Sequence, residues 1–391
     1  MKNFFSNLLS RRDLLKGLGG AVSVAGVAAL GLPARAQGPE TPLPHNMSQM
    51  KIATGIPNPV VNHSQMGHNL MVGRVDSSAN GFDPMRMLVD FDYGTVSTLP
   101  GGQVLRTYQI IARDKEIEIG PGIRFAAWTY NGRVPGPTIR CTEGDRLRVK
   151  FVNAGSHPHT IHFHGVHPAG MDGTLLGAPE VQPGESFTYE FDAEPFGCHL
   201  YHCHSLPLKR HIHKGLYGAF IVDPKESRPA ARELMMMMNA FDTDFDNAND
   251  IYAVNTVAFA YANTPIPLQV GELVRIYLIN ILEFDFVNSF HLHANMFNYY
   301  DHGTSLEPTL KLVDTISQVQ GQRGILEFRY KFPGLYMFHP HISEFTELGW
   351  MGHFNVVAPA DFPAALEQSG VDADWDVRSR AGSATGKGKR V

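Results

Sequence analysis

Two stretches of the chain share one pattern of alternating hydrophobic and polar positions. Residues 144–153 (GDRLRVKFVN) match residues 271–280 (GELVRIYLIN), and each alternates as a half-buried strand does. Each copy continues with two further apolar strands, at residues 186–191 and 218–222 in the first and at residues 324–330 and 352–357 in the second. A repeat of roughly 120–135 residues has the size of a small β-sandwich, so the pattern predicts two such domains in tandem.

The repeats divide the chain into segments. We place the first domain at residues 104–224 and the second at residues 225–358, where the Met235–Met238 run is expected to be a core strand. Residues 37–103 are predicted to form an arm over the surface, and residues 359–391 a tail whose basic part, from Arg378, is disordered. The 38 Gly and 26 Pro residues fit a turn-rich, all-β chain.

The first 36 residues have the features of an export signal. A twin-arginine pattern, Arg11-Arg12, precedes an apolar run, and Ala34-Arg35-Ala36 resembles a cleavage site. A membrane anchor is the alternative, but the run is short and Gly-rich. We therefore expect a periplasmic or secreted protein. Without this segment the chain keeps 28 basic and 37 acidic residues, a balance that argues against nucleic-acid binding.

Histidine is unusually abundant, at 19 residues, and eight histidines form four His-x-His pairs at matching places in the repeats. In a strand, residues i and i+2 lie on one face, so each pair directs two imidazoles to the same point. Imidazole suits copper, and four such pairs could hold a cluster of two or three copper ions. The pairs are His162 with His164, His202 with His204, His291 with His293, and His339 with His341.

The first repeat carries a further set of ligands. Cys203 lies between His202 and His204, so strand alternation places its thiol on the opposite face from theirs. With His159 and His211 it forms the His2Cys set of a blue-copper electron-transfer site. Electrons would pass from this site to the cluster through one strand.

The second repeat lacks the blue-copper set but keeps all four cluster histidines. The positions that match His159, Cys203, His211 and Leu216 hold other residues, namely Asn288, Pro340, Phe345 and Trp350. The two domains are therefore predicted to differ in role, because only the first could accept electrons.

Across about residues 104–358 these motifs resemble the multicopper oxidases, and most closely the two-domain, laccase-like oxidases whose blue copper lies in the first domain. The resemblance implies two cupredoxin-like Greek-key β-sandwiches and four coppers per chain: one type 1, one type 2 and two type 3. It also implies a homotrimer in which domain one of a subunit meets domain two of its neighbour. Dioxygen would be reduced to water with electrons from a phenol, an aromatic amine or a metal ion.

The resemblance assigns His159, Cys203 and His211 to the type 1 copper and the eight paired histidines to the cluster. Leu216 takes the axial position and cannot coordinate, which raises the reduction potential. His213 is an alternative to His211, but only His211 gives the four-residue step to Leu216. Asp172, Glu344 and Glu347 follow histidine pairs and are candidates for proton relay, with Asp172 and Glu344 preferred.

Two rival functions share parts of this pattern. A copper nitrite reductase resembles the chain in its domains and trimer, but it has Asp at the position of His162 and no histidine at that of His204. A non-enzymatic electron-transfer protein would need only the blue site, which leaves eight histidines unexplained. Cys141 and Cys198 match apolar positions of the second repeat, which favours two buried thiols over a disulfide.

Overall fold

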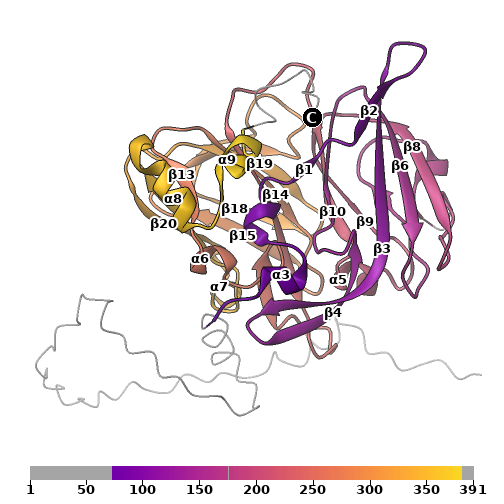
Figure 1. Cartoon of the computed structure of the whole chain (residues 1–391), viewed down its shortest axis with the longest axis horizontal. Coiled ribbons are helices and arrows are strands. Elements are labelled where there is room, and N and C mark those ends of the chain that lie inside the picture. The colour runs from indigo at the N-terminus through magenta and orange to yellow at the C-terminus, as the bar shows by residue number, and fades with distance from the viewer. Residues whose placement is uncertain (1–72, 175, 381–391) are drawn as a thin grey trace, which may run out of the picture. The chain divides into compact units, whose positions relative to one another are not determined.

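The computed structural model describes residues 73–174 and 176–380 (Figure 1). These residues belong to one compact unit of the chain, residues 60–391. The predicted export signal and most of the predicted arm lie outside the described residues. Within the described ranges, no helix has the length and apolar character needed to cross a membrane.

The first sandwich is built from two sheets. One has the order β2 (Thr95–Thr98), β3 (Val104–Gly120), β6 (Arg146–Asn153) and β8 (Ser186–Asp192), with β4 (Ile123–Tyr130) also paired to β3. The other has the order β1 (Phe91–Asp92), β5 (Thr138–Thr142), β10 (Tyr217–Asp223), β9 (Gly197–His202) and β7 (His162–Phe163). Buried positions alternate along β6, as the sequence pattern predicts.

The second sandwich repeats this plan. One sheet has the order β12 (Ile251–Val254), β11 (Arg232–Phe241), β14 (Val274–Asn280), β19 (Arg323–Phe328), β16 (Phe297–Asp301) and β17 (Leu310–Val313). The other has the order β13 (Ile266–Gln269), β21 (Gly352–Val357), β20 (Gly334–His339), β15 (Val287–Leu292) and β18 (Thr315–Val319). The run β13-β21-β20-β15 matches β5-β10-β9-β7 of the first sandwich, so the prediction of two tandem sandwiches is confirmed. The Met235–Met238 run lies buried in β11, as expected.

Part of the arm is buried, contrary to the expectation of a surface segment, whereas its strand β2 is exposed. The end of the arm forms α3 (Ser77–Asn80), α4 (Pro84–Met87), β1 and β2. Met85, Leu88 and Val89 pack into the core of the second sandwich, and Phe91 packs into a separate cluster with residues of both sandwiches. These apolar side chains have no strand or helix period, so their burial depends on partners that are distant in sequence.

The first part of the tail is also folded. Residues 359–380 contain α8 (Phe362–Gln368) and α9 (Ala373–Arg378), and Trp375 is fully buried with its indole N–H donating to the carbonyl of Met85. Arg378, expected to be disordered, ends α9 in an ion pair with Asp374. Burial of the large Trp375 side chain stabilises this segment although most residues around it are polar, since aromatic side chains bury much apolar area.

A buried group of charges joins the two sandwiches. Arg140 on β5 pairs with Asp223 on β10 and with Glu233 on β11, and Arg275 on β14 also pairs with Glu233. Burial alone would raise the pKa of Glu233, but the two guanidinium groups hold it below its ordinary value. Removing one partner of such a group costs about 3–5 kcal/mol, so it fixes how the sandwiches meet.

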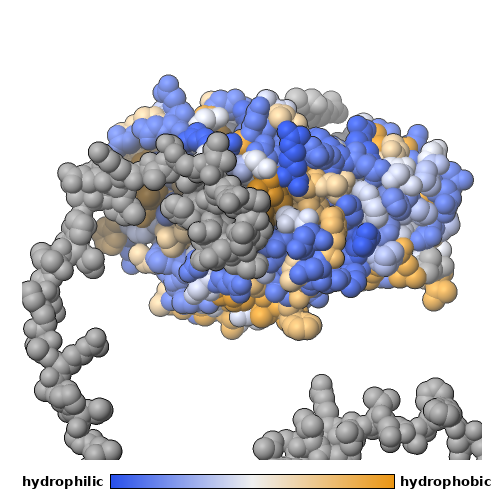
Figure 2. All heavy atoms as spheres, turned by 90° about the horizontal axis from the view of Figure 1, so that it is seen from below, coloured by the Kyte–Doolittle hydropathy of each residue, from blue (hydrophilic) through white to orange (hydrophobic). Residues whose placement is uncertain are grey.

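The two cysteines outside the predicted blue site are free and buried, so Cys141 and Cys198 form no disulfide. The face drawn in Figure 2 is largely hydrophilic, with separate hydrophobic patches. Large apolar side chains that are exposed on the described surface include Leu312, Phe332 and Leu335 of the second sandwich.

Candidate metal centres

Strand register brings the histidine pairs of each sandwich together. On the first sandwich β7 pairs with β9 so that His162 lies opposite His202. On the second, β15 pairs with β20 so that His291 lies opposite His339. Opposite residues of paired strands carry adjacent side chains, so the same backbone pairing builds a cluster of four histidines on each sandwich.

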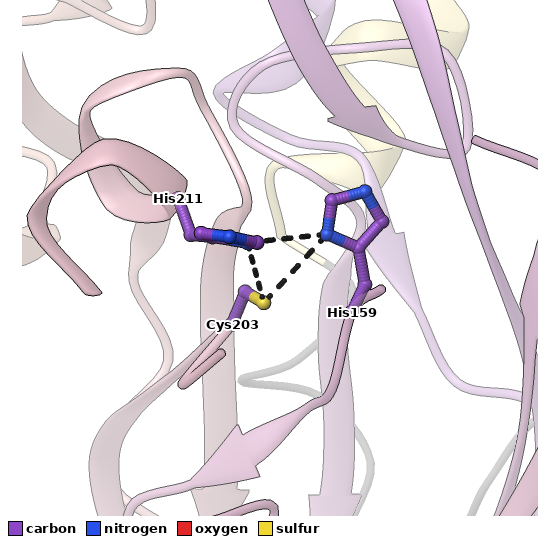
Figure 3. A group of neighbouring side chains, drawn as sticks. All are labelled: His159, Cys203 and His211. Carbon is purple, nitrogen blue, oxygen red and sulfur yellow. Dashed lines mark hydrogen bonds between the residues drawn. The ribbon is translucent and has the colours of Figure 1, made fainter. Parts of the chain in front are cut away.

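The predicted blue-copper residues converge on one point (Figure 3). His211 comes from α5 (Leu208–His213), Cys203 follows β9, and His159 lies in the loop before β7. The Cys203 Sγ lies 3.2 Å from Nδ1 of His211 and 3.9 Å from Nδ1 of His159, and the two Nδ1 atoms are 3.2 Å apart. The three side chains are 0–3% exposed. This is the donor set and the compactness of a trigonal His2Cys site.

Neighbouring groups position this set. The backbone N–H of Thr160 donates to the Cys203 Sγ at 3.4 Å, and the Cys203 N–H donates to the carbonyl of Leu216. Leu216 is fully buried in the same apolar cluster as Cys203. His213 turns away from the site, because its Nε2 accepts the backbone N–H of Asp242. The structure therefore brings His211, and not His213, to Cys203.

Burial keeps both imidazoles neutral in the metal-free chain. It lowers the pKa of His159 to about 3, with a further contribution from His211, and it lowers the pKa of His211 to about 4. Burial also raises the pKa of the Cys203 thiol, against the lowering effect of the Thr160 N–H. Neutral imidazoles are ready to bind a metal ion, whereas the thiol must release a proton when it does.

The first cluster of histidines, which we call the first quartet, consists of His162, His164, His202 and His204. Nε2 of His164 lies 3.2 Å from Nε2 of His202, and ring centroids of His162 and His204 are 5.5 Å apart. His162 Nδ1 lies 2.6 Å from the Asp172 carboxylate, and His202 Nδ1 donates to the carbonyl of Cys203. With Nδ1 occupied in this way, Nε2 is the nitrogen free to bind copper.

The second quartet, His291, His293, His339 and His341, repeats this arrangement. Nε2 of His293 lies 2.9 Å from Nε2 of His339, and His339 Nδ1 donates to the carbonyl of Pro340. His291 Nδ1 lies 2.8 Å from the Thr315 hydroxyl in place of a carboxylate. Matching hydroxyls also hold the last histidines, since Thr160 Oγ1 accepts the His204 N–H and Ser289 Oγ accepts the His341 N–H.

Within one chain the two quartets remain separate. In the part of the chain that the structure describes, each quartet makes ring contacts only within its own sandwich, and no group of converging metal-binding side chains combines the two. Three histidines in each quartet offer ligand atoms within 4.8 Å of one another. The residues present therefore fit copper, and each quartet by itself supplies half of the eight-histidine set.

The position of the blue site in the second sandwich is a packed aromatic core. Phe345 replaces His211 and stacks on Tyr252 with ring centroids 3.9 Å apart, while Trp350 is fully buried where the first sandwich has Leu216. Asn288 stands where the first sandwich has His159, and its amide nitrogen is buried without a partner. No nitrogen–sulfur set is left there to bind a metal ion.

The two predicted acids differ in their contacts. Asp172 is bonded to His162, so it orients a cluster ligand and lies where a proton could be passed to the site. Glu344 is exposed in the first turn of α7 (Ser343–Glu347), and among the described residues its carboxylate bonds to no histidine. The residue of α7 that reaches a cluster ligand is Thr346, whose hydroxyl lies 3.4 Å from Nδ1 of His339. The structure does not bring Glu344 to the quartet.

Sequence reasoning missed two further neighbours of the ligands. The indole ring of Trp128 on β4 lies 4.8 Å from the ring of His211 and 5.3 Å from that of His159, between centroids. Arg323 on β19 of the second sandwich places Nη1 3.4 Å from Nδ1 of His164. Neither residue lies near a histidine motif in the sequence. Only the matched hydroxyls Thr160 and Ser289 could have been found by aligning the repeats.

Comparison with known proteins agrees with this geometry. Two family models, both described as multicopper oxidase, match residues 112–227 and 228–360. A crystal structure of a multicopper oxidase is 57% identical, with a TM-score of 0.71, over 73% of this chain and 100% of that one. The blue copper oxidase of Nitrosomonas europaea is 27% identical, with a TM-score of 0.56, over 64% of this chain and 86% of that one.

A copper-containing nitrite reductase of Neisseria meningitidis serogroup A is also similar, at 30% identity over 65% of this chain and 70% of that protein. The two family models together cover more than half of the chain. The chain therefore belongs to the multicopper oxidase family and is a copper-dependent oxidoreductase with two cupredoxin-fold sandwiches.

Proposed function

We propose that this protein couples the one-electron oxidation of a phenol, an aromatic amine or a metal ion to the four-electron reduction of dioxygen to water. Bound copper would supply the redox chemistry, with a type 1 ion at His159, Cys203 and His211 and a three-copper cluster between two quartets. The observation that carries the proposal is that all eight cluster histidines are present and are held in two matching quartets.

The chain's own residues would connect and orient these sites. Cys203 lies between His202 and His204, so covalent bonds of a single strand end join the blue site to the first quartet. Asp172 fixes the Nδ1 proton of His162 and would pass protons toward the site where oxygen is reduced. Burial of the blue-site ligands would exclude water from a copper ion bound by them.

A homotrimer would complete the cluster. Each chain holds two separate halves of the ligand set, and a head-to-tail contact that closes into a ring would pair the first quartet of one subunit with the second quartet of the next. Exposed apolar side chains accompany the second quartet, because Leu335 lies on the same strand as His339 and is 60% exposed. Such residues are typical of an interface between subunits.

Subunit mixing tests the trimer directly. His162→Ala disables the first quartet, and His291→Ala disables the second. When the two variants are co-expressed, mixed trimers would form. At some of their subunit interfaces, the intact first quartet of the His291→Ala chain would meet the intact second quartet of the His162→Ala chain. We expect oxygen consumption to reappear in the mixture although each variant alone is inactive. A mixture as inactive as the separate variants would show that clusters do not form between subunits.

Nitrite reduction is the second candidate, since a relative that covers two thirds of the chain carries that activity in its name. His162 and His204 argue against it, because the nitrite reductase pattern lacks a histidine at both positions. The test is to supply the copper-loaded protein with a phenol under oxygen and, separately, with nitrite and a reductant without oxygen. The proposal expects four phenols oxidised per dioxygen without hydrogen peroxide. Nitric oxide production without oxygen consumption would establish the rival.

The site of action is also a proposal. The twin-arginine segment, residues 1–36, would export the folded protein to the periplasm or beyond the cell. Replacing Arg11-Arg12 with Lys-Lys should leave the protein in the cytoplasmic fraction. Export of that variant at the wild-type level would contradict this route.

A further inference from the structure

The blue site offers no ligand to an incoming reductant. His159 and Cys203 are fully buried and only 3% of His211 is exposed, so the residues that would hold the type 1 copper offer almost no surface to a substrate in solution. An electron must therefore cross at least one other side chain. A side chain that carries the electron inward must contact the ligands on one side and extend toward the surface on the other.

Trp128 and His157 form such a link. The Trp128 indole contacts both ligand imidazoles, and it also contacts the ring of His157, with centroids 4.6 Å apart. Trp128 is 8% exposed, whereas His157 is exposed in the loop between β6 and β7. The Ser156 hydroxyl lies 2.8 Å from His157 Nδ1 and holds that ring in place. Aromatic rings thus run from the solvent to His211 and His159.

We propose that His157 and Trp128 are the electron entry surface for an aromatic reductant, a phenol or an aromatic amine. This inference rests on the proposed oxidase function. The reductant stacks on the exposed imidazole and loses one electron, a phenol also releasing its proton to water. The electron would pass through the Trp128 ring and the ligand imidazoles to a copper ion held by His159, Cys203 and His211, which would be reduced from Cu(II) to Cu(I).

The chemistry of this surface favours an aromatic reductant over a metal ion. Imidazole and indole offer π-faces, against which aromatic rings pack in stacked or edge-on geometry. No cluster of metal-binding side chains in residues 73–174 and 176–380 includes His157. The nearby carboxylate of Asp114 is engaged, since Oδ2 accepts the Ser156 N–H. A metal-ion substrate would need several converging oxygen, nitrogen or sulfur ligands.

The second sandwich supplies a matched control. Trp128 and Tyr252 occupy equivalent positions, each three residues before an asparagine of positive φ, Asn131 or Asn255. Their backbone N–H groups donate to equivalent carbonyls, those of Lys214 and Leu348. Tyr252 stacks on Phe345 as Trp128 packs on His211, but no predicted ligand lies there. Loss of aromatic packing can therefore be separated from loss of electron transfer.

The test measures how fast hydroquinone, without oxygen, bleaches the blue absorption of the copper-loaded full chain. We expect Trp128→Leu to slow bleaching by about tenfold and Trp128→Phe to restore most of the rate, with the reduction potential unchanged in both. His157→Ala should raise the hydroquinone concentration that gives half the maximal rate. The controls lie in the second sandwich: Tyr252→Leu, and His302→Ala, which removes a histidine whose side chain is 39% exposed just after β16. Both should leave the two quantities at wild-type values.

The proposal is overturned if hydroquinone bleaches the Trp128→Leu protein at the wild-type rate. It is also overturned if Tyr252→Leu slows bleaching as much as Trp128→Leu does. If the Trp128→Leu protein does not bind copper, the His157→Ala protein tests the proposal instead. An unchanged hydroquinone concentration at half the maximal rate in that variant also overturns the proposal. The assay contains no oxygen, so it is independent of the cluster. The oxidase function fails separately if the wild-type protein is bleached by hydroquinone yet consumes no oxygen.

Discussion

The two sandwiches share a strand plan and a histidine quartet but differ at the centre of the fold. In the first, His211 on α5 and Cys203 after β9 converge with His159, and β4 packs against them through Trp128. In the second, the corresponding elements place Tyr252 against Phe345 and bury Trp350. The fold accommodates either a metal site or an apolar core at this place, and backbone hydrogen bonds around it recur: Leu216 N–H donates to the carbonyl of His211 as Trp350 N–H donates to that of Phe345.

The charge beside this centre differs as well. Lys214 is 8% exposed and its ammonium lies 5.1–5.4 Å from the ring centroids of Phe125, Trp128 and Phe245. No carboxylate within the described ranges forms an ion pair with it, and the equivalent residue of the second sandwich is Leu348. A desolvated cation is costly unless aromatic faces or a function offset it. The difference suggests that the cation belongs to the electron-accepting role of the first sandwich.

The largest effect should come from removing the thiol of the blue-copper set, at the position where the second sandwich has Pro340. Cys203→Ser should abolish the blue absorption and substrate oxidation, because a hydroxyl does not replace the copper-binding thiolate. Copper per chain should fall by one, as measured by metal analysis. Cys141→Ser changes a buried thiol outside the site and should keep the blue absorption. Blue colour in Cys203→Ser would show that the site is elsewhere.

Asp172 has no counterpart on the second sandwich, where Thr315 contacts His291 instead. Asp172→Asn should lower oxygen turnover or cluster copper content by about 10–100-fold, since the partners of metal-binding histidines orient them and tune their basicity. Oxygen consumption and metal analysis measure this. Glu344→Gln is the matched change on the second sandwich and should have little effect, because Glu344 is exposed. If Glu344→Gln lowers oxygen turnover or copper content as much as Asp172→Asn does, Glu344 acts at the cluster after all.

Acid should destabilise the metal-free protein. The pKa values of His159, His211 and His202 lie at about 3–4 in the folded chain, against about 6.5 when unfolded. Between these values the unfolded chain binds more protons, so stability falls as the pH drops from about 6.5 toward about 3 and then levels off. Urea unfolding at pH 7 and pH 5 measures the loss, which His211→Phe should reduce. A stability that is independent of pH across this range would contradict the buried, neutral state of these rings.

The smallest effect should come from replacing Lys214 with leucine, the residue type at the equivalent position of the second sandwich. Lys214→Leu should lower the reduction potential of the blue site, because a nearby positive charge favours Cu(I) over Cu(II). At an effective dielectric constant of about 20 the change is on the order of 1 kcal/mol. Redox titration of the blue absorption measures it, with the exposed Lys209→Leu as control. An unchanged potential would assign Lys214 to packing alone.

Much of this arrangement could be predicted from the sequence for local reasons. The i, i+2 rule fixes the faces of the paired histidines and of Cys203, and the repeat fixes which strands pair. Contacts between distant segments could not be predicted: Trp128 lies 83 residues before His211 in the chain. The burial of Met85 and Trp375 likewise depends on tertiary partners, since neither belongs to a periodic apolar pattern. The exposed position of Glu344 on α7 could not be predicted from its place in the sequence after the last histidine pair.

Copper per chain, counted in the reconstituted protein together with its absorption and electron paramagnetic resonance spectra, tests the central claim most directly. The account predicts four coppers per chain: one with blue-site signatures, one normal type 2 ion and a coupled pair without a resonance signal. Two coppers per chain and no coupled pair would contradict it, because a single ion in place of three would then bind between the quartets, as expected of a nitrite reductase.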